Sequence, residues 1–375
     1  MVVSMIMGAA AIAVLPLTTV VGVALIAAVV IGTLLEPGIG LIVTLIAGPW
    51  AAWMNTYYPG LLPIDAGQIM VGFTLGAWML GGLAKREFVI PRSPLLIPIG
   101  LFVGWAAITL LWAPDLVFGL PEVIKWIEIM LVMWLALDVA QRRGAHWIVA
   151  GILAATALQA LIGIYEARIR GVGPLGFMLS EGVYRAYGTF EQPNPFAGFI
   201  GMVLPIAVSI TAYDVVRVVY FLIARRLSVR GLPVGLVTRY LLRFTLYAFV
   251  TLLLAAGLYL SFSRGAWLGA AAALGAVIVF APRRLWLGLA LGAVALIGLI
   301  ALSNAGLLPA SIAERLADAG TLLEIRDVRG VPINDVNYSL IERQAHWQAA
   351  LNMLREHPWT GVGFSNYQPL YEQYR

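Results

Sequence analysis

The feature that most constrains this chain is a series of apolar runs, each long enough to cross a lipid bilayer as a helix. A transmembrane helix needs about 20 mostly apolar residues. Runs of this kind cover residues 8–34, 38–54, 64–84, 94–113, 119–140, 147–167, 195–214, 244–262, 265–281 and 284–303. We therefore expect an all-α fold, a polytopic membrane helix bundle of about 10 transmembrane helices.

The composition excludes a soluble helical protein. Of the 375 residues, 61% are apolar and only 11% are charged, whereas about a quarter of the residues in a soluble chain are charged. The net charge of +5 comes from arginines clustered in short loops, so we expect no nucleic-acid partner. The chain contains no cysteine, which excludes disulfides and thiol-bound metals. The apolar N-terminus lacks a basic start and a cleavage site, so it predicts a membrane span rather than a signal peptide.

Basic residues occur in every second loop, as the positive-inside rule requires of cytoplasmic loops. They are Lys85, Arg86 and Arg92; Arg142 and Arg143; Arg217, Arg225, Arg226, Arg230, Arg239 and Arg243; and Arg283 and Arg284. The alternation places residues 112–121, 168–194, 263–265 and 304–375 outside a bacterial cytoplasmic membrane. We expect residues 1–303 to form the transmembrane bundle, with 168–194 as an extracytoplasmic loop, and 304–375 to form an extracytoplasmic helical loop. Ten spans place Met1 outside, unless the segment around Pro16 is two short pieces, so the N-terminal topology stays open.

The segment 244–281 must turn in its middle. Its 38 residues are interrupted only by Ser261-Phe-Ser-Arg-Gly265, and as one helix they would extend about 57 Å, nearly twice the thickness of the hydrocarbon core. The turn carries Arg264, on the side where the charge rule disfavours arginine. An ordinary anchoring arginine is the plain alternative, but a charged residue at this position favours a protein-facing or ligand-binding role.

Three arginines are predicted at this membrane face, namely Arg185, Arg264 and Arg343. A guanidinium presents a rigid fork of donors that matches phosphate oxygens, so the three would suit the phosphate of a lipid carrier. The polar residues Gln192 and Asn194 could bind sugar hydroxyls, and the ring of Tyr187 or Phe190 could stack on a sugar.

Each of these interpretations has a structural alternative. Residues 188–195 could simply form a turn in which Asn194 is the N-cap of the next helix and Pro195 its first residue. For Arg343, a surface salt bridge is as well supported as a ligand role. We expect no metal site, because no histidine pattern has metal-ligand spacing.

The tail predicts one more amphipathic helix. A capping-box pattern begins at Ser339, and the helix should end before Pro358. Its apolar face is expected to contain Leu340, Trp347, Leu351 and Leu354.

Four motifs in this order resemble the O-antigen ligase and polymerase superfamily of bacterial membrane glycosyltransferases. They are R-x-Y-G-T-F-x-x-P-N-x-x-A at residues 185–197, S-R-G-A at 263–266, E-R-x-x-x-W-x-x-A at 342–350 and H-P-x-x-G-V-G at 357–363. The resemblance covers roughly residues 60–375. It implies an enzyme that needs no metal or other cofactor and takes a glycan from undecaprenyl pyrophosphate at the outer face of the cytoplasmic membrane. The acceptor would be lipid A core, a growing polysaccharide or another hydroxyl, including that of a protein.

By the same resemblance, Arg185 and Arg264 would bind the pyrophosphate and stabilise its departure. Arg343 would assist them, and Asn194 would position the donor. In that family a histidine downstream of the glycine turn is assigned as the base, and residues 364–375 contain none. We therefore expect a truncated chain, with Glu191, or no protein base at all, as the alternative. A transporter or flippase is the rival interpretation, but it predicts charged residues in mid-span and inverted repeats.

Overall fold

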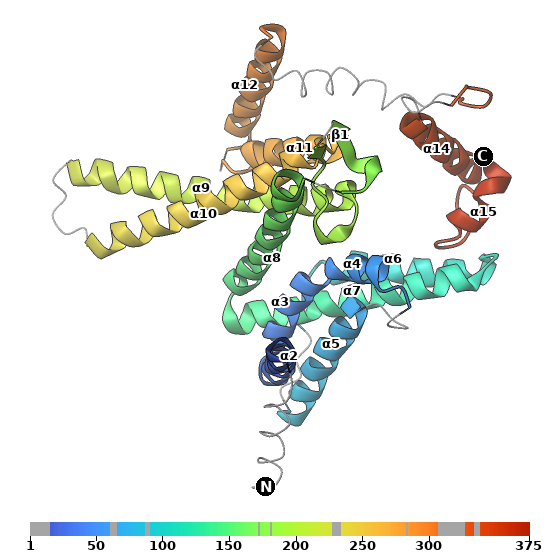
Figure 1. The fold of residues 1–375 in the computed structure, drawn as a ribbon, viewed down its shortest axis with the longest axis horizontal. Coiled ribbons are helices and arrows are strands. Elements are labelled where there is room, and N and C mark those ends of the chain that lie inside the picture. The colour runs from blue at the N-terminus through green and yellow to red at the C-terminus, as the bar shows by residue number, and fades with distance from the viewer. Residues whose placement is uncertain are drawn as a thin grey trace. The chain divides into compact units, whose positions relative to one another are not determined.

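The structure, a computed structural model, describes residues 16–60, 66–86, 91–171, 173–180, 182–226, 234–282, 284–306, 327–333 and 338–375. Across these residues the fold is helical, and the short strands β1 (Met178–Ser180) and β2 (Val183–Tyr184) pair antiparallel (Figure 1). The expected all-α class is confirmed.

Apolar helices coincide with the expected spans. They are α2 (Leu17–Leu35), α3 (Pro37–Ala47), α4 (Trp50–Tyr57), α5 (Ala66–Ala84), α6 (Leu96–Thr109) continued by η1 (Leu110–Trp112), α7 (Leu116–Arg143), α8 (Ala145–Tyr165) continued by η2 (Glu166–Arg170), α9 (Pro193–Arg226), α10 (Val234–Leu260), α11 (Arg264–Phe280) and α12 (Leu285–Asn304). Short 3₁₀ turns η3 (Leu175–Phe177) and η4 (Gly188–Phe190) precede α9, and α14 (Tyr338–Glu356) and α15 (Tyr367–Tyr374) form the tail.

Six helices in the described ranges are long and apolar enough to cross a membrane. The pair α3 and α4, bent by 52° at a short break, makes a seventh span if it is counted as one. The remaining expected spans are the shorter apolar helices Leu96–Trp112 and Arg264–Phe280, together with α7. A multi-pass membrane protein is therefore confirmed, and residues 8–15 of the first expected span lie outside the described residues.

The chain divides into two compact units. The first unit contains Met1–Val89 and Leu135–Ala295, and the second unit contains Ile90–Trp134 and Leu296–Arg375. The boundary expected at residue 303 separates the transmembrane bundle from an extracytoplasmic segment. The two units are defined by packing, so they do not test this boundary, and it stays a prediction.

The core of the first unit lies where α8, α9, α10 and α11 meet. Phe196 and Ile200 of α9 and Leu254 of α10 are completely buried there. The long helices α9 and α10 run side by side (Figure 1), and the buried Asp214 of α9 faces Arg243 of α10 at 3.4 Å.

Close packing at this core depends on a glycine of α8. A Cβ atom built on Gly163 would lie 2.4 Å from Cζ of Phe196, which is far inside the contact distance of two carbon atoms. The helices α8 and α9 can approach each other here only because residue 163 has no side chain.

We expect Gly163→Ala to lower the thermal unfolding midpoint of the detergent-purified protein. Glycine to alanine normally favours a helix by up to about 1 kcal/mol, but overpacking a core costs about 1–3 kcal/mol. Gly76→Ala in α5 is the matched control, because nothing lies within 4 Å of a Cβ built there. A Gly163→Ala protein at least as stable as Gly76→Ala would contradict this packing.

In the second unit, the glycine turn of the tail is fastened to the loop between α6 and α7. The buried Asn366 accepts a hydrogen bond from the Asp115 N–H (2.9 Å) and donates to the Asp115 carbonyl (3.1 Å). Gly363, at φ +92°, packs so closely that a Cβ there would lie 2.6 Å from Cα of Ala113. The turn is thus a specific docking element of this unit.

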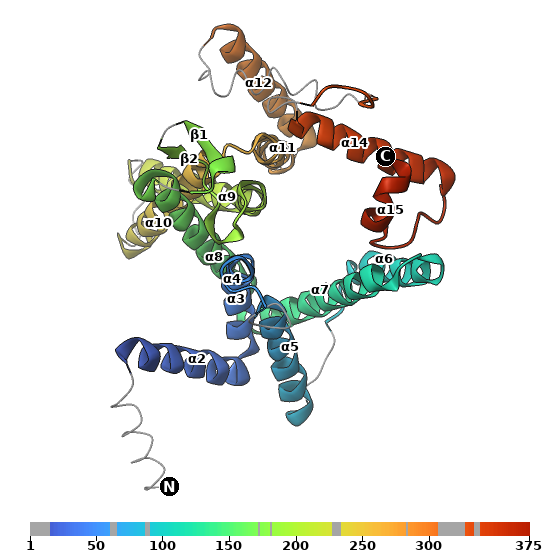
Figure 2. The ribbon, with the colours of Figure 1, turned by 45° about the vertical axis from the view of Figure 1, so that its right-hand side comes forward.

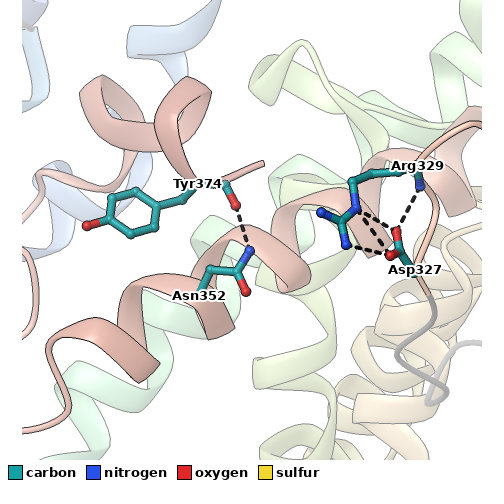
Figure 3. A network of polar contacts seen from close by, with 4 residues as sticks. All are labelled: Asp327, Arg329, Asn352 and Tyr374. Atoms are coloured by element: carbon teal, nitrogen blue, oxygen red, sulfur yellow. Dashed lines mark hydrogen bonds and ion pairs between the residues drawn. The ribbon is translucent and has the colours of Figure 1, made fainter.

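The tail helix α14 forms close to the expected limits, and its buried positions differ from the apolar face that the sequence indicates. The buried positions are Ile341, Gln344, Ala349 and Met353, whereas Trp347 and Leu354 are exposed. The helix α14 packs against α15. Polar contacts of His346 and Asn352 with α15 accompany this packing. Figure 3 shows one such contact, in which the Asn352 amide donates to the Tyr374 carbonyl at 2.9 Å; it also shows the exposed Asp327–Arg329 ion pair.

Candidate functional site

The site is built on the connection between α8 and α9 in the first unit. This connection contains the β1–β2 pair, which lies near the end of α8 (Figure 2). The Arg185 N–H donates to the Phe177 carbonyl at 2.9 Å, and the Ala186 N–H donates to the carbonyl of Leu260, the last residue of α10, at 2.8 Å. The backbone around Arg185 is therefore fixed against the end of α10, directly before the Ser261–Ser263 turn.

Side chains then join this connection and the start of α9 to the Ser261–Ser263 turn, 69 to 76 residues further along the chain. Arg185 donates from Nε to the Ser261 carbonyl (2.8 Å) and from Nη2 to Oδ1 of Asn194 (3.2 Å). The same oxygen of Asn194 accepts a hydrogen bond from the Ser263 hydroxyl at 3.0 Å. A guanidinium has five N–H donors, so these two bonds orient the group and leave its charge in place.

The starts of two helices meet at Asn194. The helix α9 begins at Pro193, so Asn194 lies in its first turn, and α11 begins at Arg264 with Ser263 as its N-cap. The first turns of both helices, which the structure describes completely, contain no acidic residue. Helix N-termini carry partial positive charge on their free N–H groups and favour anions, so the first turn of α11 adds positive charge near Arg185. The start of α9 adds less, because Pro193 and Pro195 have no N–H.

The structural alternative, in which Asn194 is the N-cap of this helix, is wrong. The carbonyl of Gln192 accepts the first helical hydrogen bond, from the Phe196 N–H at 3.3 Å, and Pro193 rather than Pro195 is the first helical residue. The side chain of Asn194 is consequently available to bridge Arg185 and Ser263, which a capping side chain could not do.

Arg264 is exposed and begins α11 directly after the expected break in the apolar run 244–281. The break is confirmed, but the two helices do not form a closely packed hairpin. Instead α11 packs mainly on α9, with Gly201 of α9 next to the Ala266 carbonyl. The Trp267 indole donates to the Leu258 carbonyl at 2.9 Å and fixes the turn that presents Arg264.

Two polar residues that were not selected from the sequence support the loop: Gln159 of α8 and Glu166, the first residue of its continuation η2. Gly188 N–H donates to a carboxylate oxygen of Glu166 at 2.8 Å. The Thr189 N–H donates to Oε1 of Gln159 at 3.1 Å, and Nε2 of Gln159 donates back to the Thr189 hydroxyl at 2.9 Å. All these groups are buried. A signal existed, because Gln159 and Glu166 are two helical turns apart in an otherwise apolar span, and buried polar groups in membranes are functional candidates.

We expect Gln159→Leu to free the loop around Gly188. The substitution keeps the volume but leaves the buried Thr189 N–H without an acceptor, at a cost of about 1–3 kcal/mol. Hydrogen–deuterium exchange of the amides at Gly188 and Thr189 should accelerate at least about fivefold. Thr156→Val is the control, because the buried Thr156 hydroxyl bonds only within its own helix, to the Ile152 carbonyl; equal acceleration in both variants would rule out the supporting role.

The remaining predicted sugar-binding residues differ in accessibility. Tyr187 is only 3% exposed and packs against Phe177 with ring centroids 5.4 Å apart, and burial raises the pKa of its hydroxyl to about 12. Its ring is thus largely covered by protein, and a stacking role stays an untested prediction. Gln192 is exposed at the start of α9. The half-buried Glu191 adopts φ +55°, and burial raises the pKa of its carboxyl above the usual range.

Arg343 belongs to the second unit, where it is exposed on α14. Three residues later on the same helix, His346 is held by α15. Its Nδ1 lies 2.7 Å from the Tyr367 hydroxyl, which donates to the His346 carbonyl at 3.0 Å. These contacts fix the helix that carries Arg343, and its role toward the donor stays a prediction.

Comparison with known families agrees with the motif order. Residues 249–375 match the family described as O-Antigen ligase, a range that contains Arg264 and Arg343, while Arg185 and Asn194 precede it. No curated protein and no solved structure matches the chain. The resemblance to the O-antigen ligase and polymerase superfamily is thus confirmed over the matched range, and it supports a ligase or polymerase activity in a multi-pass membrane protein.

Proposed function

We propose that this chain is a membrane glycosyltransferase that moves a glycan from undecaprenyl pyrophosphate to an acceptor hydroxyl at the outer face of the bacterial cytoplasmic membrane. The acceptor belongs to the group implied by the family: lipid A core, a growing polysaccharide or another hydroxyl. The reaction needs no metal, because arginines and helix N-termini supply the positive charge.

One observation carries this proposal. The first turns of α9 and α11 converge at the Asn194–Ser263 hydrogen bond, with the Arg185 guanidinium bonded to the same Asn194 oxygen. The next residue of the chain after Ser263 is Arg264. A diphosphate carries two phosphate groups, and the donors proposed for them are Arg185, Arg264 and the backbone N–H groups in the first turn of α11. The start of α9 adds only the Asn194 N–H, because Pro193 and Pro195 have none.

The chemistry follows from this charge. The acceptor oxygen attacks the anomeric carbon of the glycan, and the bond from that carbon to the phosphate oxygen breaks. The bonding electrons move to the leaving diphosphate, and the proton of the acceptor hydroxyl passes to water or to that diphosphate. Donors that are already positioned where negative charge develops stabilise the transition state more than the ground state. The rigid attachment of Arg185 to the ends of α9 and α10 provides this positioning.

Transfer by the purified protein in liposomes tests the proposal. The substrate is a glycan linked to undecaprenyl pyrophosphate, offered alone and with lipid A core, and the products are the free carrier diphosphate and the enlarged glycan. Acceptor-dependent transfer supports the proposal. Release of glycan to water without an acceptor indicates a hydrolase instead, and movement of intact donor across the bilayer without release indicates a transporter.

A further inference from the structure

Two neighbouring cavities lie at the opposite end of α8 from the Arg185 loop. An apolar groove of about 230 Å³ is lined by Ile39, Ile42 and Leu45 of α3, by Val139 of α7 and by Ile148 of α8. Its mouth is formed by Glu36, Arg143 and Trp147. All of these residues belong to the first unit.

The groove must be filled by something apolar. It is bordered by α8, which is a candidate span, and by α3, which is half of the bent span. An apolar groove beside transmembrane helices faces acyl chains and not water, so a lipid chain is its natural occupant. Trp147, which is half exposed at the mouth, is the residue type enriched where a membrane meets water.

The charges at the mouth select the headgroup. A neighbouring cavity shares Glu36 and Val139 with the groove and adds Lys85, Asp138 and Arg142. The charged side chains lining the two cavities are thus three cations, Lys85, Arg142 and Arg143, against two carboxylates, Glu36 and Asp138. The two cavities together therefore carry a net positive charge. Their basic residues belong to the helix ends and loops that the positive-inside rule assigns to the cytoplasm.

Arg143 is held in place without being covered. It donates from Nε (3.0 Å) and Nη2 (2.6 Å) to a single oxygen of Glu36, and its side chain remains 56% exposed. Asp138 is anchored from the other direction by the Trp78 indole (3.0 Å) and by Nε of Arg142 (2.8 Å). The carboxylates therefore orient the two arginines, and an oxygen anion could replace part of the Glu36 contact.

We propose that this groove binds one anionic phospholipid of the cytoplasmic leaflet, with an acyl chain along α3 and its phosphate group at Arg143 and Lys85. Basic pockets between transmembrane helices on the cytoplasmic side suit anionic headgroups. The site is independent of the glycan transfer proposed above.

Native mass spectrometry of the full chain in detergent tests this site, with phosphatidylglycerol and phosphatidylethanolamine of equal chain length as probes. The wild type should retain phosphatidylglycerol preferentially. Arg143→Gln should lower its retention about fivefold, equivalent to about 1 kcal/mol for one basic side chain. Glu36→Gln should raise retention, because it removes the carboxylate that competes with the lipid phosphate. If the ion pair were only structural, the two variants would change retention in the same direction.

Three further variants separate the groove from general effects. Leu45→Trp and Ile148→Phe fill the groove and should lower retention of both lipids; unchanged retention in a folded variant would overturn the proposal. Arg217→Gln removes an exposed arginine elsewhere in the first unit and should leave retention unchanged. Equal retention of the two lipids by the wild type, or an equal loss in Arg217→Gln and Arg143→Gln, would show nonspecific binding.

Discussion

Arg264→Ala is expected to lower glycan transfer about 100- to 1,000-fold, the effect of removing one donor that stabilises charge in a transition state. Arg264 is the first residue of α11 and follows Ser263, whose hydroxyl is bonded to Asn194. Arg264→Lys should lose less, because lysine keeps the charge but lacks the planar fork that matches two phosphate oxygens. The measurement is acceptor-dependent transfer in liposomes at saturating donor.

Arg284→Ala provides the matched control. Arg284 is also an exposed arginine at the start of an apolar helix, since its carbonyl accepts the Leu287 N–H at 3.0 Å. It lies where the charge alternation assigns the cytoplasmic side, so its loss should leave transfer near the wild-type rate. Wild-type rates in both Arg264 variants, with correct folding, would remove Arg264 from the mechanism.

Asn194→Asp should lower glycan transfer at least about 100-fold while the protein keeps its fold. Aspartate retains an oxygen that accepts from Arg185 and from the Ser263 hydroxyl, and the new ion pair should strengthen the junction. The added negative charge, however, opposes a diphosphate at the same position, and like charges in contact cost several kcal/mol. In Asn194→Asp, the thermal unfolding midpoint should therefore rise while the rate of glycan transfer falls.

Asn194→Ser distinguishes charge from structure. Serine is neutral but too short to bridge both partners, so this variant should be less stable than Asn194→Asp and yet more active. If Asn194 only joined the helices, activity would instead follow stability, and Asn194→Asp would be the more active of the two. The order of the two variants in the two measurements decides the question.

The helical architecture was predictable because hydropathy decides it. Runs of about 20 apolar residues have few alternatives in a bilayer, and the turn before Arg264 followed from length alone. Charge alternation also placed residues 168–194 and 263–265 on one face, and the Arg185–Ser261 and Asn194–Ser263 bonds join these two segments.

The supporting contacts were not predictable from local patterns. Gln159 and Glu166 bond to backbone N–H groups 30 and 22 residues away, and a sequence pattern does not identify a backbone partner. Asn194 was interpreted as a sugar-binding residue, with capping as the alternative, and neither interpretation contains its tertiary contacts with Arg185 and Ser263. The packing of α11 on α9, rather than on its sequence neighbour α10, is also a feature that only the three-dimensional arrangement reveals.

The helix α8 sets the distance between the Arg185 loop and the opposite end of this span. From Ala145 to Glu166 it rises about 32 Å at 1.5 Å per residue, close to the hydrocarbon thickness of about 30 Å. Because Glu166 and Gln159 bond the loop rigidly to this helix, the loop cannot follow a bilayer of different thickness. If the proposed function holds, hydrophobic mismatch would lift Arg185 away from the lipid headgroups in a thin membrane and draw it toward the acyl region in a thick one. Bilayer thickness thereby becomes a variable that sets in which membranes this protein can work.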